Sequence, residues 1–161
     1  MPATDPAPAA PGAGGRRRVL LLNGPSLNLL GTRDPAVYGS ATLADVEARV
    51  TALAGTYGID VTCAQRNGEG ELIDLVHGAA DLDGIILNPG AYAHTSYALR
   101  DAVEAVGTPC VEVHISNVHA REPFRHTSVT SPVMAGFVAG FGPLGYELAV
   151  HALAQLTTRA S

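Results

Sequence analysis

Two side chains suited to acid–base chemistry lie far apart in this sequence. Tyr38 ends the stretch NGPSLNLLGTRDPAVY, in which Arg33 precedes it by five residues. A phenol is a weak base near neutral pH because its reference pKa is about 10, but a nearby guanidinium favours the phenolate and lowers that pKa. Tyr38 is therefore a candidate base, with Arg33 as the cation that tunes it.

His114 is the candidate acid. An imidazolium can protonate a leaving hydroxyl group, and Glu112 can orient the ring because residues two apart share one face of a strand. The next two residues offer consecutive backbone N–H groups and a hydroxyl, which suit a carboxylate ligand. Arg121 and Arg125 have the spacing of one helical turn and can hold further oxygens. Together these residues predict proton abstraction and proton donation on a small anion that is rich in oxygen.

A parallel sheet would bring these residues together. Short apolar runs alternate with helix-like segments, which predicts βαβ units and a doubly wound sheet of flavodoxin size with helices on both faces. The predicted strands cover residues 18–23, 59–64, 84–88, 109–115 and 133–141. The predicted helices cover residues 42–58, 70–80, 96–106 and 143–156, the first with Thr42 as N-cap and Gly58 as stop.

The polar segments of the chain each follow the carboxyl end of a predicted strand. They read NGPSLNLLGTRDPAVYG, QRNGEGE, NPGAYAHTS and HISNVHAREPFRH, whereas the joints from helix to strand are short and plain. Ligands of open α/β sheets bind beyond the carboxyl ends of the strands. We therefore expect Asn88 and His94, in the third segment, to lie beside Tyr38 and His114.

Length and composition predict one globular domain. The 161 residues are 47% hydrophobic, enough for an ordinary core. Residues 1–17 are rich in Pro, Ala and Gly without periodicity, which predicts a disordered tail before a single domain at residues 18–161. No apolar run is long enough to span a membrane.

Composition also excludes several classes of function. All 10 basic residues are arginines, so neither a Schiff-base lysine nor the lysine of a Walker-type phosphate loop is available. After Arg18 seven arginines face fourteen acidic residues, the opposite of a surface that binds nucleic acid. Cys63 and Cys110 lie in strand-like runs without a metal-binding pattern, which predicts reduced, buried thiols in a cytoplasmic protein.

The motif GFGPLG at residues 140–145 has the glycine spacing of a dinucleotide-binding loop. A dinucleotide fold also needs a further strand and an acidic residue about 20 residues later, and neither follows here. We expect these glycines to serve tight turns and the close packing of a helix on the sheet.

Five stretches of the sequence closely resemble the type II 3-dehydroquinate dehydratases. They are LNGPSLNLLGTRDPAVYG, GELIDLVH, LNPGAYAHTSYALRDA, VEVHISNVHAREPFRH and GFGPLGYELAV. The resemblance implies a flavodoxin-like domain of five parallel strands in the order 2-1-3-4-5. It also implies trans-elimination of water from 3-dehydroquinate to give 3-dehydroshikimate through an enolate, without cofactor or metal. A cytoplasmic homo-oligomer is implied too, a dodecamer built from trimers, in the shikimate pathway of aromatic amino acid biosynthesis or in quinate catabolism.

The resemblance further implies a role for each matching residue. Tyr38 matches the base that removes a proton from C2, and Arg33 the arginine on a mobile lid loop that lowers its pKa. His114 matches the acid for the C1 hydroxyl, with Glu112 behind it. The substrate-binding residues are Asn88, His94 and Arg125 for the ring hydroxyls, Ile115 and Ser116 for the carboxylate, Arg121 as a further arginine, and Asp101, which is presented to a neighbouring subunit's site.

Ser26 marks the main departure from the family. The usual NGPN reads NGPS here, and the resemblance implies that the asparagine helps to hold a water that stabilises the enolate. A serine hydroxyl has a shorter reach and lacks the two-sided amide. Losing one oxyanion donor can cost on the order of 10²–10³ in rate, although a lengthened water bridge would reduce the penalty. The segment QRNGEGE also departs from the usual RQSNHEGE, and we expect it to be peripheral to the site.

Two other classes of function stay open at this point. The serine is compatible with a related lyase or with a dehydratase of shifted substrate preference. A non-enzymatic flavodoxin-like binding or assembly module is disfavoured, because such a scaffold need not keep Tyr38, Arg33 and His114 together.

Overall fold

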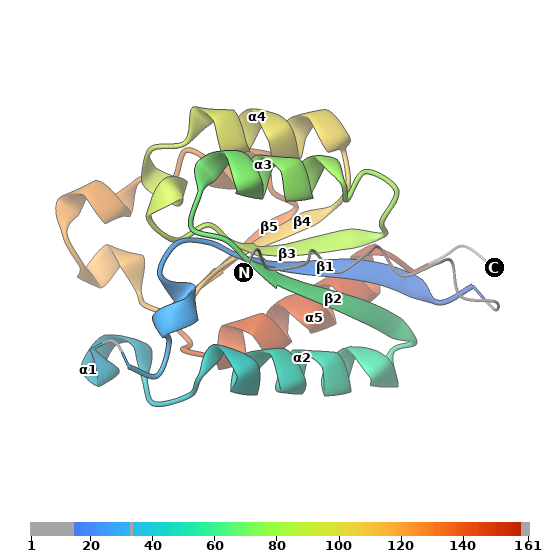
Figure 1. Cartoon of the computed structure of the whole chain (residues 1–161), viewed down its shortest axis with the longest axis horizontal. Helices are drawn as coiled ribbons and strands as arrows, with labels where there is room; N and C mark the ends of the chain where they lie inside the picture. Colours follow the sequence, from blue (N-terminus) through green and yellow to red (C-terminus); the bar gives the residue numbers. More distant parts are fainter. Residues whose placement is uncertain (1–14, 33, 159–161) are drawn as a thin grey trace, which may run out of the picture.

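Five parallel strands form the sheet at the centre of the molecule (Figure 1). In chain order they are β1 (Arg17–Asn23), β2 (Ile59–Gln65), β3 (Gly84–Asn88), β4 (Cys110–His114) and β5 (Gly136–Ala139). Every pairing is parallel and the strand order is β2-β1-β3-β4-β5, which confirms the predicted fold. The structure, a computed structural model, describes residues 15–32 and 34–158; Arg33 and most of the predicted tail lie outside these residues.

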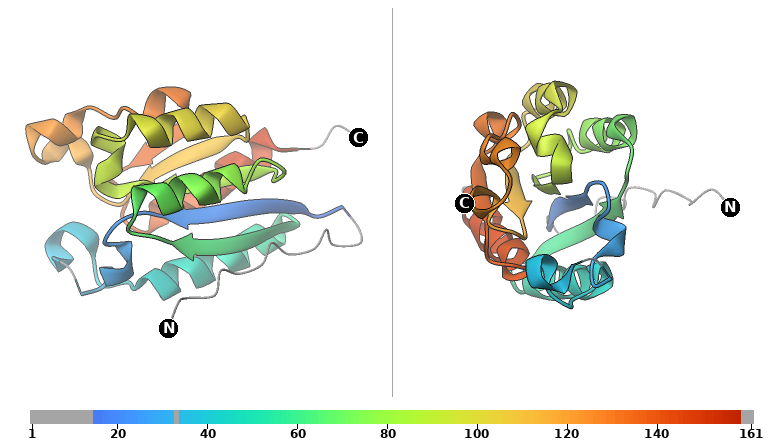
Figure 2. Two further views of the ribbon diagram at one scale, coloured as in Figure 1. Left: turned by 45° about the horizontal axis from the view of Figure 1, so that its top comes forward. Right: turned by 90° about the vertical axis from the view of Figure 1, so that its left-hand side faces the viewer.

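Helices cover both faces of this sheet (Figures 1 and 2). α2 (Leu43–Thr56) and α5 (Leu144–Leu156) pack on one face, and α3 (Glu69–His77) and α4 (Tyr97–Val106) pack on the other. A single turn, α1 (Pro35–Tyr38), lies beyond the sheet. Short 3-10 helices occupy the loops: η1 (Leu27–Leu29), η2 (Gly90–His94), η3 (Val118–Ala120), η4 (Pro123–His126) and η5 (Ser131–Val133).

The core follows from the alternation of side chains along the strands. Leu21 and Val111 face α2 and α5, whereas Leu20 and Leu87 face α3 and α4, and all four are buried. A strand that is covered on both faces needs a continuous apolar run, and β1 supplies one. The sheet is therefore covered on both faces, and its carboxyl edge carries the loops, of which Leu27, Leu30 and Ile115 also join the core.

Several element boundaries differ from the prediction. β5 spans only residues 136–139 because the segment before it forms η5 and Gly140 leaves the strand at φ +94°. α3 begins at Glu69 and ends at His77, three residues earlier than expected, and β1 begins one residue earlier, at Arg17. Helix α1 and the 3-10 turns were not predicted, since elements of three to five residues leave no periodic apolar pattern.

The termini of α2 match their predicted caps. Thr42 accepts a hydrogen bond from the backbone of Asp45, whose carboxylate accepts one from the backbone of Thr42. This reciprocal pair satisfies two N–H groups that the first turn leaves without partners. Gly58, at φ +69°, follows the helix in the left-handed conformation that favours glycine.

The GFGPLG motif serves turning and packing, as predicted. Gly140 and Gly142 both have positive φ. A Cβ atom on Gly145 would lie 3.4 Å from Val113 and 3.5 Å from Val138, so this glycine lets α5 approach the sheet closely. In the part of the chain that the structure describes, no helix is both long enough and apolar enough to cross a membrane.

Candidate active site

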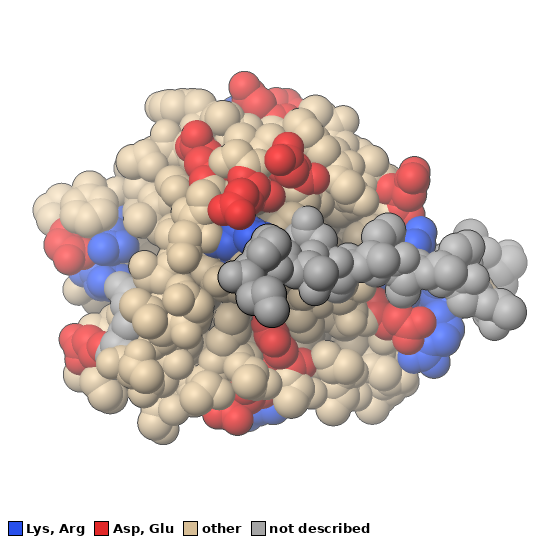
Figure 3. Space-filling view, in the orientation of Figure 1, with Lys and Arg blue, Asp and Glu red and all other residues tan. Residues whose placement is uncertain are grey.

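A pocket lies at the carboxyl edge of the sheet, where the polar segments meet. Residues that end strands or short helices supply its walls: Asn88 ends β3, His114 ends β4 and Tyr38 ends α1. The predicted site residues that line it are Ser26, Tyr38, Asn88, His94, His114, Ile115, Ser116, Arg121 and Arg125. In Figure 3, arginine atoms lie at the end of the molecule that carries α1 and the η3–η4 segment. The structure therefore brings these nine predicted residues together around one pocket.

Tyr38 is held at the pocket by an arginine that follows β4. Nη1 of Arg121 donates hydrogen bonds to the Tyr38 hydroxyl oxygen, at 3.0 Å, and to the Ser116 hydroxyl oxygen, at 3.2 Å. The Arg121 guanidinium carbon also lies 5.5 Å from the centre of the Tyr38 ring. A guanidinium that donates to a phenolic oxygen favours negative charge on that oxygen. Arg33, to which the sequence assigned this task, lies outside the described residues.

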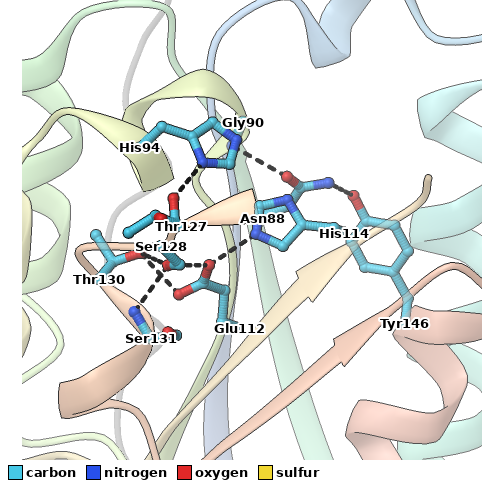
Figure 4. A network of polar contacts seen from close by, with 10 residues as sticks. All are labelled: Asn88, Gly90, His94, Glu112, His114, Thr127, Ser128, Thr130, Ser131 and Tyr146. Carbon is cyan, nitrogen blue, oxygen red and sulfur yellow. Dashed lines mark hydrogen bonds and ion pairs between the residues drawn. The ribbon is translucent and has the colours of Figure 1, made fainter. Parts of the chain in front are cut away.

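His114 is paired with Glu112 as the strand period predicts. Its Nε2 lies 2.7 Å from Oε1 of Glu112, and the carboxylate is completely buried (Figure 4). An ionised carboxylate only accepts hydrogen bonds, so Nε2 carries a hydrogen and Nδ1 is the nitrogen left to act on a ligand. Glu112 does not line the pocket itself; it lies behind the histidine.

The orientation of the Asn88 amide follows from its partners. Its Oδ1 accepts a hydrogen bond from the backbone N–H of Gly90, at 3.1 Å, and its Nδ2 donates one to the Tyr146 hydroxyl, at 2.8 Å. The Tyr146 hydroxyl in turn donates to Oδ1 of Asn23. An amide nitrogen has two hydrogens, so Asn88 can present a second N–H group to a ligand in the pocket.

His94 is fixed by a loop rather than by a carboxylate. Its Nδ1 lies 2.8 Å from the backbone carbonyl oxygen of Thr127, and a carbonyl cannot donate, so Nδ1 carries the hydrogen. In the neutral ring Nε2 is then an acceptor, suited to a hydroxyl group. The rings of His94 and His114 stack at 6.3 Å between their centres.

The arginines of the η3–η4 segment share one acidic partner. Glu122 accepts from Nε of Arg125 at 2.6 Å and lies 3.9 Å from Nε of Arg121. A hydrogen bond from its own backbone N–H, followed by that from Arg125, lowers the pKa of Glu122. Arg121 directly follows η3 and Arg125 lies in η4, so the two arginines do not share an α-helix, but both line the pocket.

Ser26 adopts an unusual backbone conformation. Its φ of 67° and ψ of 1° place it in the left-handed region, where no other non-glycine residue of the described chain is found. Its backbone N–H donates to Oδ1 of Asn67 at 3.0 Å, and the Tyr92 hydroxyl donates to the carbonyl of Asn67 at 2.8 Å. Asn67 belongs to the QRNGEGE segment, which does not line the pocket but contacts the loop that carries Ser26.

Asp101 is the predicted site residue that the structure places away from the pocket. It lies exposed in the middle of α4 and does not line the cavity. Three further residues around the site were missed by sequence reasoning: Thr130, Ser128 and Tyr146. Ser128 and Thr130 belong to no motif, and Tyr146 lies within GFGPLGYELAV with nothing in the sequence to mark it as a polar contact at the site, so only the contacts reveal these residues. Among the described residues, no group of acidic, histidine or cysteine side chains is arranged to hold a metal ion.

Comparison with known proteins identifies the family. A family model described as dehydroquinase class II matches residues 17–154. The chain belongs to the class II dehydroquinase family. It is 57% identical over 140 residues to a 3-dehydroquinate dehydratase of Anoxybacillus flavithermus, an alignment that covers 86% of this chain and 95% of that protein. It is also 57% identical over 139 residues to the 3-dehydroquinate dehydratase of Azorhizobium caulinodans, covering 86% and 93%.

Solved structures agree with this assignment. The type II dehydroquinase from Propionibacterium acnes has a TM-score of 0.82 at 43% identity, over 86% of this chain and 97% of that one. The type II dehydroquinase from Butyrivibrio crossotus has a TM-score of 0.84 at 43% identity and the same coverage. The family resemblance inferred from the sequence motifs is thus confirmed.

Proposed function

We propose that this chain removes water from 3-dehydroquinate to give 3-dehydroshikimate, by a trans-elimination in which Tyr38 is the base and His114 the acid. Membership of the class II dehydroquinases supports the reaction. The observation that carries the mechanism is a pocket with a phenol held by a guanidinium on one wall and an imidazole backed by a buried carboxylate on another.

In the first step the Tyr38 oxygen takes a proton from C2 of the substrate. The electron pair of the broken C–H bond moves toward the adjacent ketone and forms an enolate. Arg121 supports the step because its N–H stabilises the oxygen before it accepts the proton. Arg33, five residues before Tyr38, is proposed to assist, as its match to the family implies.

In the second step the enolate collapses and the C1 hydroxyl leaves. The hydrogen on Nδ1 of His114 is transferred to that hydroxyl, so the leaving group is water. Glu112 accepts from Nε2 and stabilises the imidazolium before the transfer. Ser26, alone or through a water, is proposed to stabilise the enolate oxygen while both bonds change.

Substrate binding is proposed to use the remaining pocket residues. The backbone of Ile115 and the hydroxyl of Ser116 would hold the carboxylate, and Arg121 fixes that hydroxyl. The N–H of Asn88, the Nε2 acceptor of His94 and the guanidinium of Arg125 would bind the ring hydroxyls. No step of this scheme requires a metal or an organic cofactor.

We also propose the setting in which the enzyme works. The family resemblance favours a homo-oligomer, a dodecamer built from trimers, in which Asp101 serves a neighbour's site. Its exposure on α4 is compatible with such a contact. The unpaired thiols Cys63 and Cys110 favour a cytoplasmic location. The reaction would belong to the shikimate pathway or to quinate catabolism.

The test is to mix the purified protein with 3-dehydroquinate and to follow the enone absorbance of the product. Tyr38→Phe should lower kcat on the order of 10²–10⁴-fold, the usual contribution of a general base. Tyr57→Phe is the matched control, because Tyr57 lies outside the pocket and contacts His151. Turnover near the wild-type rate in Tyr38→Phe would overturn the base assignment. No turnover by the wild-type protein in any buffer would overturn the proposed reaction.

A further inference from the structure

Glu112 is held by two hydroxyl groups as well as by His114. Thr130 donates to Oε2 at 2.7 Å, and Ser128 donates to Oε1 at 3.1 Å, the same oxygen that lies 2.7 Å from the histidine (Figure 4). Thr130 and Glu112 are both fully buried, with 0% of their surface exposed. The carboxylate that supports the proposed acid therefore has a set of donors that the sequence motifs do not include.

The hydrogen positions in the cluster of Glu112, His114, Ser128 and Thr130 follow from counting the available donors. Ser128 accepts from the backbone N–H of Ser131, at 3.0 Å, and each hydroxyl has one hydrogen to give. The hydroxyl oxygens of Ser128 and Thr130 lie 3.2 Å apart, but if both hydrogens point to Glu112 neither is left for that contact. The cluster then supplies three donors to a carboxylate that has only acceptors, which is the arrangement that stabilises its ionised form.

Apart from His114, hydroxyl groups are the main partners that offset the cost of burying the charge of Glu112. Within the described residues the ion-pair partner of Glu112 is His114, and no arginine contacts the carboxylate. A buried charge is costly unless it is paired and hydrogen-bonded. The ionised state of Glu112 thus depends on Thr130 and Ser128 more than it would if a guanidinium were present.

The loop of residues 127–131, here the 127–131 loop, also reaches the second pocket histidine. Its Thr127 carbonyl accepts from His94, and its Val129 N–H donates to the carbonyl of Ala93 at 2.7 Å. One loop therefore contacts His94 directly and His114 through Glu112. Figure 4 shows the labelled residues of this loop beside Glu112 and His94.

We propose that Thr130, with Ser128, is a positioning residue that keeps Glu112 ionised and aligned behind the acid His114. This inference rests on the proposed function, since it assigns Thr130 a part in the same dehydration. Thr130 does not line the pocket and acts through Glu112. Its loss should weaken proton donation more than substrate binding, so kcat should change more than KM.

The effect on pH dependence has a definite sign. The hydrogen bond from Thr130 favours the ionised carboxylate of Glu112, so a variant without this hydroxyl stabilises that form less. A neutral Glu112 no longer stabilises the imidazolium, and the acid side of the kcat/KM profile moves to higher pH. Among the described residues, the other titratable or charged groups around Glu112 and His114 are Cys110 on β4, His94 on η2, Tyr38 and Arg121 in the same pocket, and His119, Arg125 and His126 around the adjoining cavity.

The experiment compares Thr130→Val, Thr130→Ser and Thr108→Val with the wild-type chain. Thr130→Val keeps the shape and removes the donor, and should lower kcat on the order of 10-fold, as expected for a lost hydrogen bond to a charged group. Thr130→Ser restores the hydroxyl and should restore the rate. Thr108 is also buried, and its hydroxyl donates to a backbone carbonyl remote from the pocket, so Thr108→Val controls for the loss of a buried hydroxyl.

A second readout does not require turnover. NMR titration of the His114 ring in the ligand-free protein should give a shifted midpoint in Thr130→Val and a wild-type midpoint in Thr130→Ser and Thr108→Val. If Thr130→Val does not fold, Ser128→Ala gives the same comparison. An unchanged kcat/KM profile and an unchanged His114 midpoint in a folded variant would overturn the positioning role while wild-type turnover still supported the reaction. Absence of wild-type turnover would instead overturn the proposed function. The NMR titration would still show whether Thr130 acts on His114 through Glu112.

Discussion

At the scale of single residues, Ser26 combines an unfavourable backbone conformation with a side chain that is shorter than asparagine and lacks its amide. The left-handed conformation costs roughly 1–2 kcal/mol for most L-residues, but less for asparagine and glycine. Ser26 occupies it at φ 67°, at the position where the family resemblance predicts asparagine. The serine therefore lowers stability through its backbone conformation and also lacks the amide that would help to stabilise the enolate.

Two substitutions separate these effects. Ser26→Asn and Ser26→Gly should each raise the free energy of unfolding by about 1 kcal/mol, because both residues suit the left-handed region. Only Ser26→Asn supplies an amide to the enolate, so only this variant should raise kcat. Denaturant unfolding and steady-state kinetics measure the two quantities. An equal kcat in all three proteins would mean that Ser26 already stabilises the enolate adequately.

The sequence predicts residues best when their positions follow a simple period. The spacing of two between Glu112 and His114 placed them on one face of a strand, and their contact at 2.7 Å agrees. Thr130 has no such signal, because it approaches Glu112 across a loop, eighteen residues further along the chain. Arg121 was predicted as a ligand for oxygens, but its contact with Tyr38 depends on how two loops fold over each other.

At the scale of elements, Tyr146 ties a helix to two strands at the edge that forms the pocket. Its hydroxyl joins Asn23 at the end of β1 to Asn88 at the end of β3, from a position on α5. Burial raises the pKa of Tyr146, and the hydrogen bond from Asn88 only partly opposes this effect. The folded protein therefore requires a neutral phenol at this junction.

The protein should lose stability in alkaline solution because of this tyrosine. Below pH about 10 the phenol is neutral in both folded and unfolded chains, and its contribution is fully present. Above that pH the unfolded chain gains by ionising, so the free energy of unfolding falls by up to about 1.4 kcal/mol per pH unit. Phenolate absorbance should show one tyrosine that titrates only on unfolding.

Tyr146→Phe tests the assignment. This variant should be less stable at neutral pH, because Asn23 and Asn88 lose a partner, but its stability should depend less steeply on alkaline pH. Tyr97→Phe is the control, since Tyr97 is 66% exposed and takes no part in this junction. The same alkaline slope in Tyr146→Phe and the wild-type chain would contradict the prediction.

Helices and strands that are long enough to show a periodic apolar pattern were predictable from the sequence, and shorter elements were not. α2 has an apolar stripe and a capping box, and both ends agree with the prediction within a residue or two. α1 has four residues, and its start depends on Asp34 accepting from the N–H of Ala36 with Pro35 in the first turn. Local capping of this kind fixes where Tyr38 points, but it has too few residues to show a pattern.

At the scale of the whole molecule, one chain brings together the proposed base, the proposed acid and the proposed oxygen-binding residues but leaves Asp101 on the outside of α4. Parallel topology explains the first part, since every strand delivers its loop to one edge. It also shows why the sequence alone could not place Asp101, because helix periodicity gives an exposed face without saying what lies against it. In the oligomer that we propose, this carboxylate would reach a neighbouring subunit's pocket.

Mixed oligomers test whether Asp101 acts in a neighbour's site. Tyr38→Phe and Asp101→Ala subunits, each impaired alone, would be co-expressed with different tags and purified through both. If a site takes Tyr38 from one subunit and Asp101 from the next, about a quarter of the sites in a random equimolar mixture regain both residues. Activity should then rise to about a quarter of the wild-type value, with sizing to confirm that the mixture assembles as the wild-type protein does. If the mixed oligomer has only the average activity of the two variants, Asp101 acts within its own chain or not at all, and the neighbour model is wrong.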